Sequence, residues 1–420
     1  MSGGTRKARH WALIGVPLAA AAIAALIAAA PGRAQEAEAS NLIEALQRRL
    51  DDGSASLAHA GEAQGYLPAL LKELGIPRSS QLLVFSGSSL QFDRISQRTP
   101  RAIYYQDDAS LGVVQQGRLI ELIVSDKATG VAFYTLDVEK AEKPRFTRRT
   151  GECIICHGFA SRWAPGLMVA DYETGPNGQL LNLDPRNLFR LTDHRTPFEG
   201  RYGGWYVTGT TGAMKHKGNV TRDPAYPMDV PAGGLNLTSL SGRIDTSRYL
   251  EPGSDAVSLL TLEHQAGLVN LITRINAQYR GLNNTSLVPG LRATQADIDA
   301  SLAELEAYIT FADEVPLPSP VTGTSAFSRE FAAAGPADGR GRSLRQFDLK
   351  TRLFRYPLSY MIYSQAFDNL HPDARSRLLA RVYDRLRAAR TPEAAAAINI
   401  AAATKPGLPD TWKPVPEPAR

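Results

Sequence analysis

The stretch RAIYYQDDASLGVVQQGRLIELIVSDKATGVAFYTL, residues 101–136, decides the fold of this 420-residue chain. It consists of short runs rich in Val, Ile, Tyr and Phe, and the polar segments QG and DKATG separate them. Runs of this composition bounded by turn residues predict strands joined by tight turns. Together with LLVFS at residues 82–86, the stretch predicts an antiparallel β meander.

Helices are predicted on both sides of this meander. Before it, residues 40–75 contain leucines at a helical spacing and the run GYLPALLKELG. After it, a helix is expected to begin at Pro252-Gly253-Ser254, with the apolar face Val257, Leu260, His264, Leu268, Leu271 and Ile275. Another should begin at a capping box formed by Thr294 and Asp297, and two more lie around residues 357–370 and 373–390. The fold class predicted is α+β: an antiparallel β meander leading into a ligand-binding segment, followed by a mainly helical C-terminal half.

Residues 158–250 are rich in Gly, Pro, Asn and Asp and predict mostly irregular structure. GGWYVTG at residues 203–209 is the one strand expected inside it. Coil of this length is uncommon in a compact domain unless it serves a function. We therefore divide the chain into residues 1–34, a leader; 35–250, the N-terminal helices, meander and binding region; 251–404, a helical region; and 405–420, a loose Pro-rich tail.

The first 34 residues have the three parts of a signal peptide. Basic TRKARH precedes an apolar run at residues 11–30, and Gly32 and Ala34 suit the small-residue positions of a cleavage site. The apolar run is long enough to span a bilayer if it is not removed. We therefore expect export to the periplasm, with membrane association only if the leader stays uncleaved.

The net charge of +5 lies almost entirely in this leader, which holds four basic residues and no acidic one. The remaining chain has 47 − 4 = 43 basic residues against 42 acidic residues. No block rich in Lys and Arg stands out downstream. Nucleic-acid binding is therefore not expected.

Both cysteines of the chain lie in CIICH, residues 153–157. C-x-x-C-H is the spacing of covalent haem attachment: two thiols one helical turn apart can bond the two vinyl groups of haem, and the next residue, His157, is placed to bind the iron. A disulfide is the ordinary alternative in an exported protein. A thioredoxin-like pair would follow a buried strand, whereas polar, basic PRFTRRT precedes this motif, and a zinc site would need further ligands.

CIICH resembles the attachment motif of c-type cytochromes over these five residues. Small soluble cytochromes of this class have a helix before the motif, whereas this chain has strand-like sequence there. The chain also resembles a group of large exported mono-haem proteins without an established activity. That second resemblance depends on QRTPRAIYYQDDASLG, HRTPFEGRYGGWYVTG, KHKGN and LEHQAGLVNLITR. Both resemblances imply one covalent haem c held by Cys153, Cys156 and His157.

The sixth position of the iron has several candidate ligands in the sequence. His216 lies in a Gly-rich segment that permits close approach to a flat ligand, although a histidine between two lysines is more often solvated. His264 lies on an apolar helix face, where a hydrogen-bonded core histidine is the commoner outcome. Met168 and Met214 are further candidates, and the site is otherwise open or filled by water. Arg201 and Trp205 are expected to bind the haem propionates, with Arg195 and Trp163 as further candidates.

These observations lead to three hypotheses on function. The first is a periplasmic mono-haem c-type cytochrome that carries out one-electron transfer to a redox partner protein. The second is a haem-dependent, peroxidase-like oxidoreductase that acts on a small-molecule substrate at an open or weakly ligated sixth site. The di-haem peroxidase pattern needs two attachment motifs, whereas this chain has one, which counts against that particular family. The third is a haem-based sensor. The sequence assigns no catalytic residue.

Overall fold

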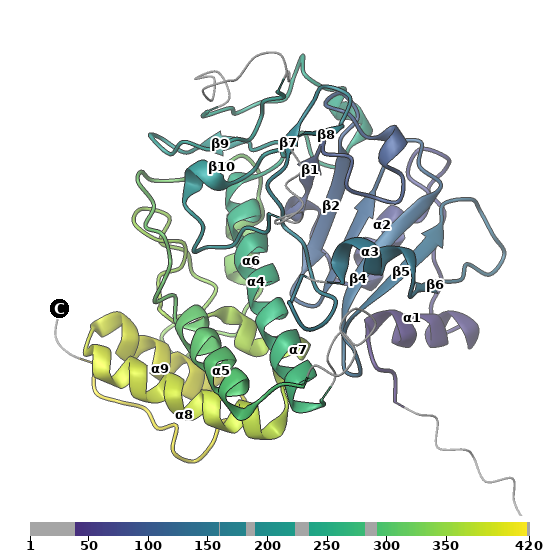
Figure 1. Ribbon diagram of the computed structural model, residues 1–420. Helices are drawn as coiled ribbons and strands as arrows, with labels where there is room; N and C mark the ends of the chain where they lie inside the picture. Colours follow the sequence, from purple (N-terminus) through teal and green to yellow (C-terminus); the bar gives the residue numbers. More distant parts are fainter. Residues whose placement is uncertain (1–37, 159, 182–189, 223–234, 282–291, 418–420) are drawn as a thin grey trace, which may run out of the picture. The chain divides into compact units, whose positions relative to one another are not determined.

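The predicted meander forms the centre of a six-stranded antiparallel sheet in the computed structural model, which describes residues 38–158, 160–181, 190–222, 235–281 and 292–417 (Figure 1). The strands lie side by side in sequence order. Their bounds are β1 Leu82–Val84, β2 Arg101–Gln106, β3 Ala109–Val113, β4 Leu119–Asp126, β5 Gly130–Asp137 and β6 Thr147–Arg149. With the helices that follow, this sheet confirms the predicted α+β class.

The two faces of the sheet belong to two different cores. Because side chains alternate along a strand, Val131 and Phe133 of β5 face one core, while Ala132 and Tyr134 face the other. The second core is closed by the N-terminal helices α1 Leu42–Asp51 and α2 Leu67–Glu73, as predicted. The first core is built around the long helix α4 Ala256–Tyr279, which lies against β5.

Helix α4 is the centre of the C-terminal half. It begins after Asp255, whose carboxylate accepts hydrogen bonds from the backbone N–H groups of Val257 and Ser258. Nearly all its residues are buried, so the six positions of the predicted apolar face lie in the core together with most of the others. Around it lie α5 Gln295–Ile309, α6 Phe327–Ala333, α7 Gln365–Asp368, α8 Pro372–Ala389 and α9 Pro392–Thr404. Helix α5 starts at the predicted capping box of Thr294 and Asp297.

The predicted strand GGWYVTG does not form as a unit. The backbone turns at Tyr202 and Gly204, which both have positive φ, and only Trp205 bridges to Val84 of the sheet. A Cβ atom at Gly204 would lie 2.7 Å from the Ser86 Cβ, so this close approach requires glycine. The other short elements of the irregular region are β7 Glu173–Thr174, β8 Leu180–Leu181 and β9 Gly209–Thr210, the last paired with β10 Thr322–Gly323.

The C-terminal segment differs from the loose tail that the sequence predicts. Trp412 is buried, packs on Tyr383 of α8 and donates to the backbone oxygen of Ile398 in α9 at 3.2 Å. Glu417 pairs with Arg342 at 2.7 Å. Glu417 also pairs with Arg340 at 3.1 Å, and Lys405 pairs with Asp368 at 2.6 Å. An aromatic anchor and these ion pairs therefore hold residues 405–417 in place, despite their proline content.

Residues from Ala39 onward form a single compact unit. The predicted leader, residues 1–34, lies outside the described residues. None of the helices that the structure describes combines the length and the apolar composition needed to cross a bilayer.

Candidate functional site

The CIICH motif forms the short helix α3 Glu152–His157, which directly follows the edge strand β6. Strand β6 pairs with β5, with Phe133 opposite Arg149, so the sheet fixes where the helix starts. Cys153 and Cys156 lie three residues apart and line the same cavity, whereas Ile155 between them is 76% exposed. One helical turn therefore presents both thiols in one direction.

The cavity in front of α3, which we call the motif cavity, has a volume of about 360 Å³. This lies within the range of roughly 300–1,000 Å³ typical of small-molecule and cofactor sites. Its walls come from the sheet, the loop at residues 86–92, the segment at 167–172 and helix α4. Most of the lining is apolar, including Ile103, Ile123, Phe133, Leu167, Met168, Val169, Tyr172, Trp205, Leu262 and Ala266.

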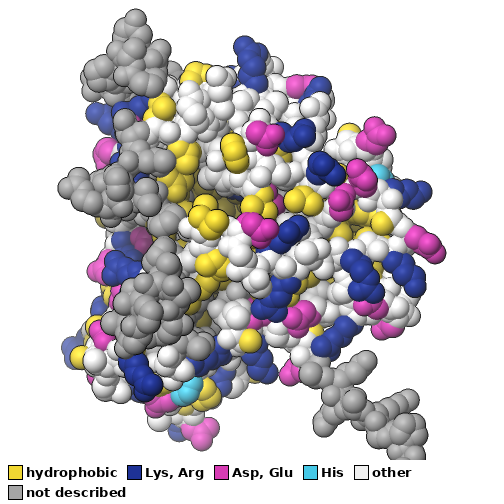
Figure 2. Space-filling model, turned by 45° about the vertical axis from the view of Figure 1, so that its right-hand side comes forward, with side chains coloured by type: hydrophobic (Ala, Val, Ile, Leu, Met, Phe, Trp, Pro, Cys, Tyr) yellow, Lys and Arg dark blue, Asp and Glu magenta, His cyan; other side chains and the backbone are white. Residues whose placement is uncertain are grey.

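The mouth of the motif cavity also carries exposed hydrophobic residues. Leu90 and Phe92 line the cavity and are 39% and 63% exposed. Figure 2 shows hydrophobic side chains gathered on one face of the molecule, among charged side chains of both signs. Single exposed apolar residues are ordinary, but clusters of them mark binding sites, so Leu90 and Phe92 extend the apolar lining of the motif cavity toward solvent.

A backbone hydrogen bond fixes the tautomer and orientation of the His157 ring. Its Nδ1–H donates to the backbone oxygen of Gly166 at 2.8 Å, which leaves the lone pair on Nε2. Within the described chain, Nε2 has no hydrogen-bond partner. Burial lowers the pKa of His157, so the ring is neutral at neutral pH. The Phe133 ring packs beside it, with ring centroids 4.9 Å apart.

The two thiols are free and protonated. Cys153 and Cys156 form no disulfide. Burial raises the pKa of Cys153 to about 11, with Glu121 and Glu152 adding to the effect, and burial also raises the pKa of Cys156. A thioredoxin-like pair requires a lowered thiol pKa, because the thiolate is the nucleophile. The surroundings of Cys153 and Cys156 instead raise the thiol pKa, which disfavours the thiolate.

An arginine that the sequence analysis missed lies in the motif cavity. Arg101 of β2 donates to the Glu121 carboxylate of β4 at 3.3 Å, while its own Nε is buried without a partner. Glu121 also accepts from the Ser89 hydroxyl at 2.7 Å. The alternation of side chains along a strand could have indicated this placement. Arg101 and Glu121 each lie two positions before an isoleucine that lines the cavity, Ile103 and Ile123, and therefore share its face of the sheet. An unpartnered guanidinium N–H at the cavity suits a carboxylate ligand.

Of the residues predicted beyond the motif, Met168 and Trp205 line this cavity, and Trp163, Arg195, Arg201, Met214, His216 and His264 do not. The Trp205 indole donates to the backbone oxygen of Ala170 at 2.8 Å, which fixes the ring as part of the wall. Arg201 is fully buried elsewhere. It pairs with Glu263 at 3.0 Å and donates to the backbone oxygens of Thr196 and His194.

The two predicted distal histidines lie in the protein interior. His264 contacts His194 through their Nδ1 atoms at 2.7 Å and the Ser359 hydroxyl through Nε2 at 2.7 Å, and it stacks on Phe311. His216 accepts from the backbone N–H of Gly218, and burial lowers its pKa to about 4. Neither histidine is among the lining residues of the motif cavity.

Replacing Arg201 with methionine is expected to lower the free energy of unfolding by about 3 kcal/mol, because it leaves the buried Glu263 carboxylate unpaired. Urea unfolding measures the loss. Arg248→Met is the matched control, because the pair of Arg248 with Asp245 is exposed to solvent and its loss should leave the free energy of unfolding nearly unchanged. Equal losses in the two variants would contradict a buried structural role for Arg201.

The motif cavity has the chemistry that a covalently bound haem requires. Two thiols, a neutral imidazole with an available Nε2, an unpartnered arginine Nε and an apolar wall converge on it. No cluster of three or more His, Cys, Asp or Glu residues suited to a metal ion occurs in the described part of the chain. Comparisons of the chain with family models, curated proteins and solved structures gave no match.

Proposed function

We propose that this chain is an exported mono-haem c-type cytochrome that transfers single electrons to or from a redox partner. One observation carries the proposal: Cys153, Cys156 and the neutral imidazole of His157 face the same apolar cavity, and both thiols are free. A disulfide or a redox pair explains the two sulfurs but gives no role to His157 or to the cavity.

Each residue has a defined part in this proposal. The bound haem would supply the one-electron chemistry of its iron. Cys153 and Cys156 would anchor the macrocycle through thioether bonds, and His157 would ligate the iron through Nε2. The carbonyl of Gly166 orients the imidazole and increases its basicity through the Nδ1–H bond. Arg101 would bind a propionate through its unpartnered Nε, and Trp205 would form part of the apolar wall.

The cavity lining favours Met168 as the sixth ligand. Besides His157, Met168 is the one thioether or imidazole side chain among the described lining residues. A methionine ligand raises the reduction potential and suits an electron carrier. His216 and His264 were the leading candidates from sequence, but neither belongs to the lining.

A haem oxidoreductase with an open sixth site is the second candidate. The Arg101–Glu121 pair favours it, because a charged pair in a haem cavity can position a polar substrate or move a proton. Ligand binding separates the two functions. Adding cyanide to the oxidised protein and carbon monoxide to the reduced protein should leave the spectra of an electron carrier unchanged, whereas rapid shifts with both would favour the oxidoreductase.

Arg101→Gln is expected to lower the reduction potential, because losing a positive charge in the cavity stabilises the oxidised iron relative to the reduced iron. A spectroscopic redox titration measures the shift. Arg118→Gln is the control, since Arg118 is exposed and does not line the cavity. An unchanged reduction potential in Arg101→Gln would contradict the proposal that Arg101 binds a haem propionate.

A further inference from the structure

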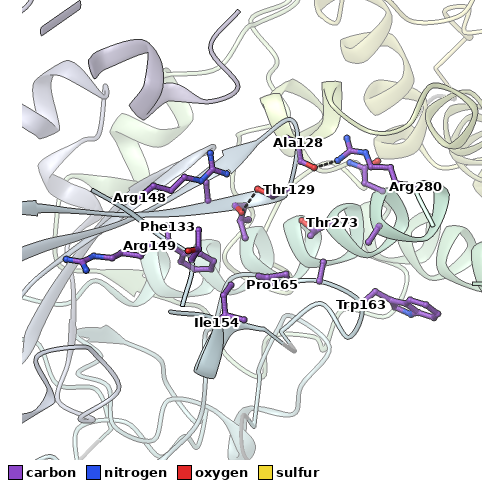
Figure 3. Close-up of a pocket in the computed structure, with 17 residues that line it drawn as sticks. Ala128, Thr129, Phe133, Arg148, Arg149, Ile154, Trp163, Pro165, Thr273 and Arg280 are labelled. Atoms are coloured by element: carbon purple, nitrogen blue, oxygen red, sulfur yellow. Dashed lines mark hydrogen bonds between the residues drawn. The ribbon is translucent and has the colours of Figure 1, made fainter. Parts of the chain in front are cut away.

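A second cavity lies on the other side of helix α3, and we call it the arginine cavity. It has a volume of about 230 Å³ and is drawn in Figure 3. Ile154 of α3 lines it, whereas the neighbouring Cys153 lines the motif cavity. Phe133 borders both cavities. Nothing in the proposed function uses the arginine cavity.

The lining of the arginine cavity combines an apolar floor with positive charge. Phe133, Ile154, Pro165 and Ala277 supply apolar surface. Arg148, Arg149 and Arg280 are the charged members, and no Asp or Glu occurs among the described lining residues. In Figure 3, Arg148 and Arg280 lie on opposite sides of the cavity, and Phe133 lies on the side of Arg148. The lining is therefore complementary to a ligand with an apolar body and a negative charge.

Arg280 is the arginine whose charge is not compensated. Arg148 pairs with Glu44 at 3.1 Å, and Arg149 lies 3.6 Å from Glu152. Arg280 instead donates to the backbone oxygens of Lys127 and Ala128 in the β4–β5 turn, and within the described chain it has no carboxylate partner. Arg280 is exposed and is bound only to neutral carbonyls, so no carboxylate of the described chain competes with an incoming anion for its guanidinium.

A hydroxyl donor accompanies this guanidinium. Thr273 of α4 lies on the same side of the cavity as Arg280 (Figure 3), and its hydroxyl has no hydrogen-bond partner among the described residues. Gly130 lets the turn approach it, because a Cβ there would lie 2.4 Å from Thr273 Cγ2. Thr273 and Arg280, the C-cap residue of α4, lie seven residues, or about two turns, apart on the same helix, so the α4 wall of the cavity offers two hydrogen-bond donors to a carboxylate ligand.

We propose that the arginine cavity binds a small monocarboxylate with an apolar body. The carboxylate is bound by Arg280 and Thr273, and the body packs on Phe133, Ile154 and Pro165. This site is separate from the motif cavity, and its existence does not depend on haem.

Isothermal titration of the purified holoprotein with sodium benzoate tests the proposal. One benzoate per chain is expected to bind saturably. Benzamide, which has the same shape without the charge, should bind at least about tenfold more weakly, because a hydrogen bond to a charged group is lost. Arg280→Gln should weaken benzoate binding by a similar factor, and Thr273→Val should weaken it several-fold.

Arg101→Gln is the matched control, because it removes an arginine from the motif cavity and should leave benzoate affinity unchanged. Absent saturation would overturn the proposal, as would equal binding of benzamide or a larger effect of Arg101→Gln than of Arg280→Gln. If Arg280→Gln fails to fold because the β4–β5 turn loses its contacts, Thr273→Val decides the question alone, and unchanged affinity in that variant overturns the proposal.

Discussion

Replacing both Cys153 and Cys156 with serine is expected to abolish covalent haem. Serine keeps the size and helix position of each residue but cannot form the thioether, so any remaining haem would dissociate under denaturing conditions. The measurement is a haem stain after denaturing electrophoresis of exported protein. The sheet and α4 should remain intact, because both sulfurs face the cavity and form no disulfide.

Ile155→Ser is the matched control for this experiment. Ile155 lies between the two cysteines on the same helix, but its side chain is 76% exposed and does not line the cavity. Covalent haem should therefore be retained in this variant. Persistent staining of the double serine variant, or equal loss of stain in Ile155→Ser, would contradict the role assigned to the two thiols.

Met168→Ala is expected to convert a low-spin haem spectrum to a high-spin one. Alanine removes the one thioether side chain among the described lining residues of the motif cavity, so the sixth position would be left to water or remain open. The visible absorption spectrum measures the change, together with loss of the band that methionine ligation gives. Small external ligands that the wild-type protein excludes should then bind the variant.

His216→Ala and His264→Ala serve as comparisons, because both histidines were candidates and neither lines the cavity. Their folded fractions should keep the wild-type spin state. His264→Ala is also expected to be less stable, because it breaks the buried contacts to His194 and Ser359. A low-spin spectrum that survives in Met168→Ala and disappears in His216→Ala would contradict the assignment of Met168.

The sheet could be predicted because its signals are local. Strand composition and turn residues between 101 and 137 agree, and the short connections between β2, β3, β4 and β5 favour an antiparallel meander. Helix α9 was missed because TPEAAAAINIAAAT has an apolar character on every side and no amphipathic period. The segment GGWYVTG was taken for a strand from its aromatic residues, but its glycines serve the close approach to Ser86.

The candidate site also has a part that the sequence predicts and a part that it does not. Cys153, Cys156 and His157 are adjacent in sequence, and a single helical turn brings them together. The cavity wall comes from segments up to about 180 residues apart, so no spacing rule connects Arg101 to the motif. Met168, 11 residues after His157, was one of several candidate ligands that the sequence alone could not rank. Arg201 and His264 were candidate haem-binding residues, but both have structural partners in the core. Arg201 pairs with Glu263, and His264 contacts His194 and Ser359.

The intact mass of the exported wild-type chain under denaturing conditions tests the central claim most directly. The account predicts a chain heavier than its polypeptide by one haem, with the added mass on the peptide that contains residues 153–157. A mass equal to the polypeptide, or lower by the two hydrogens of a disulfide, would contradict it.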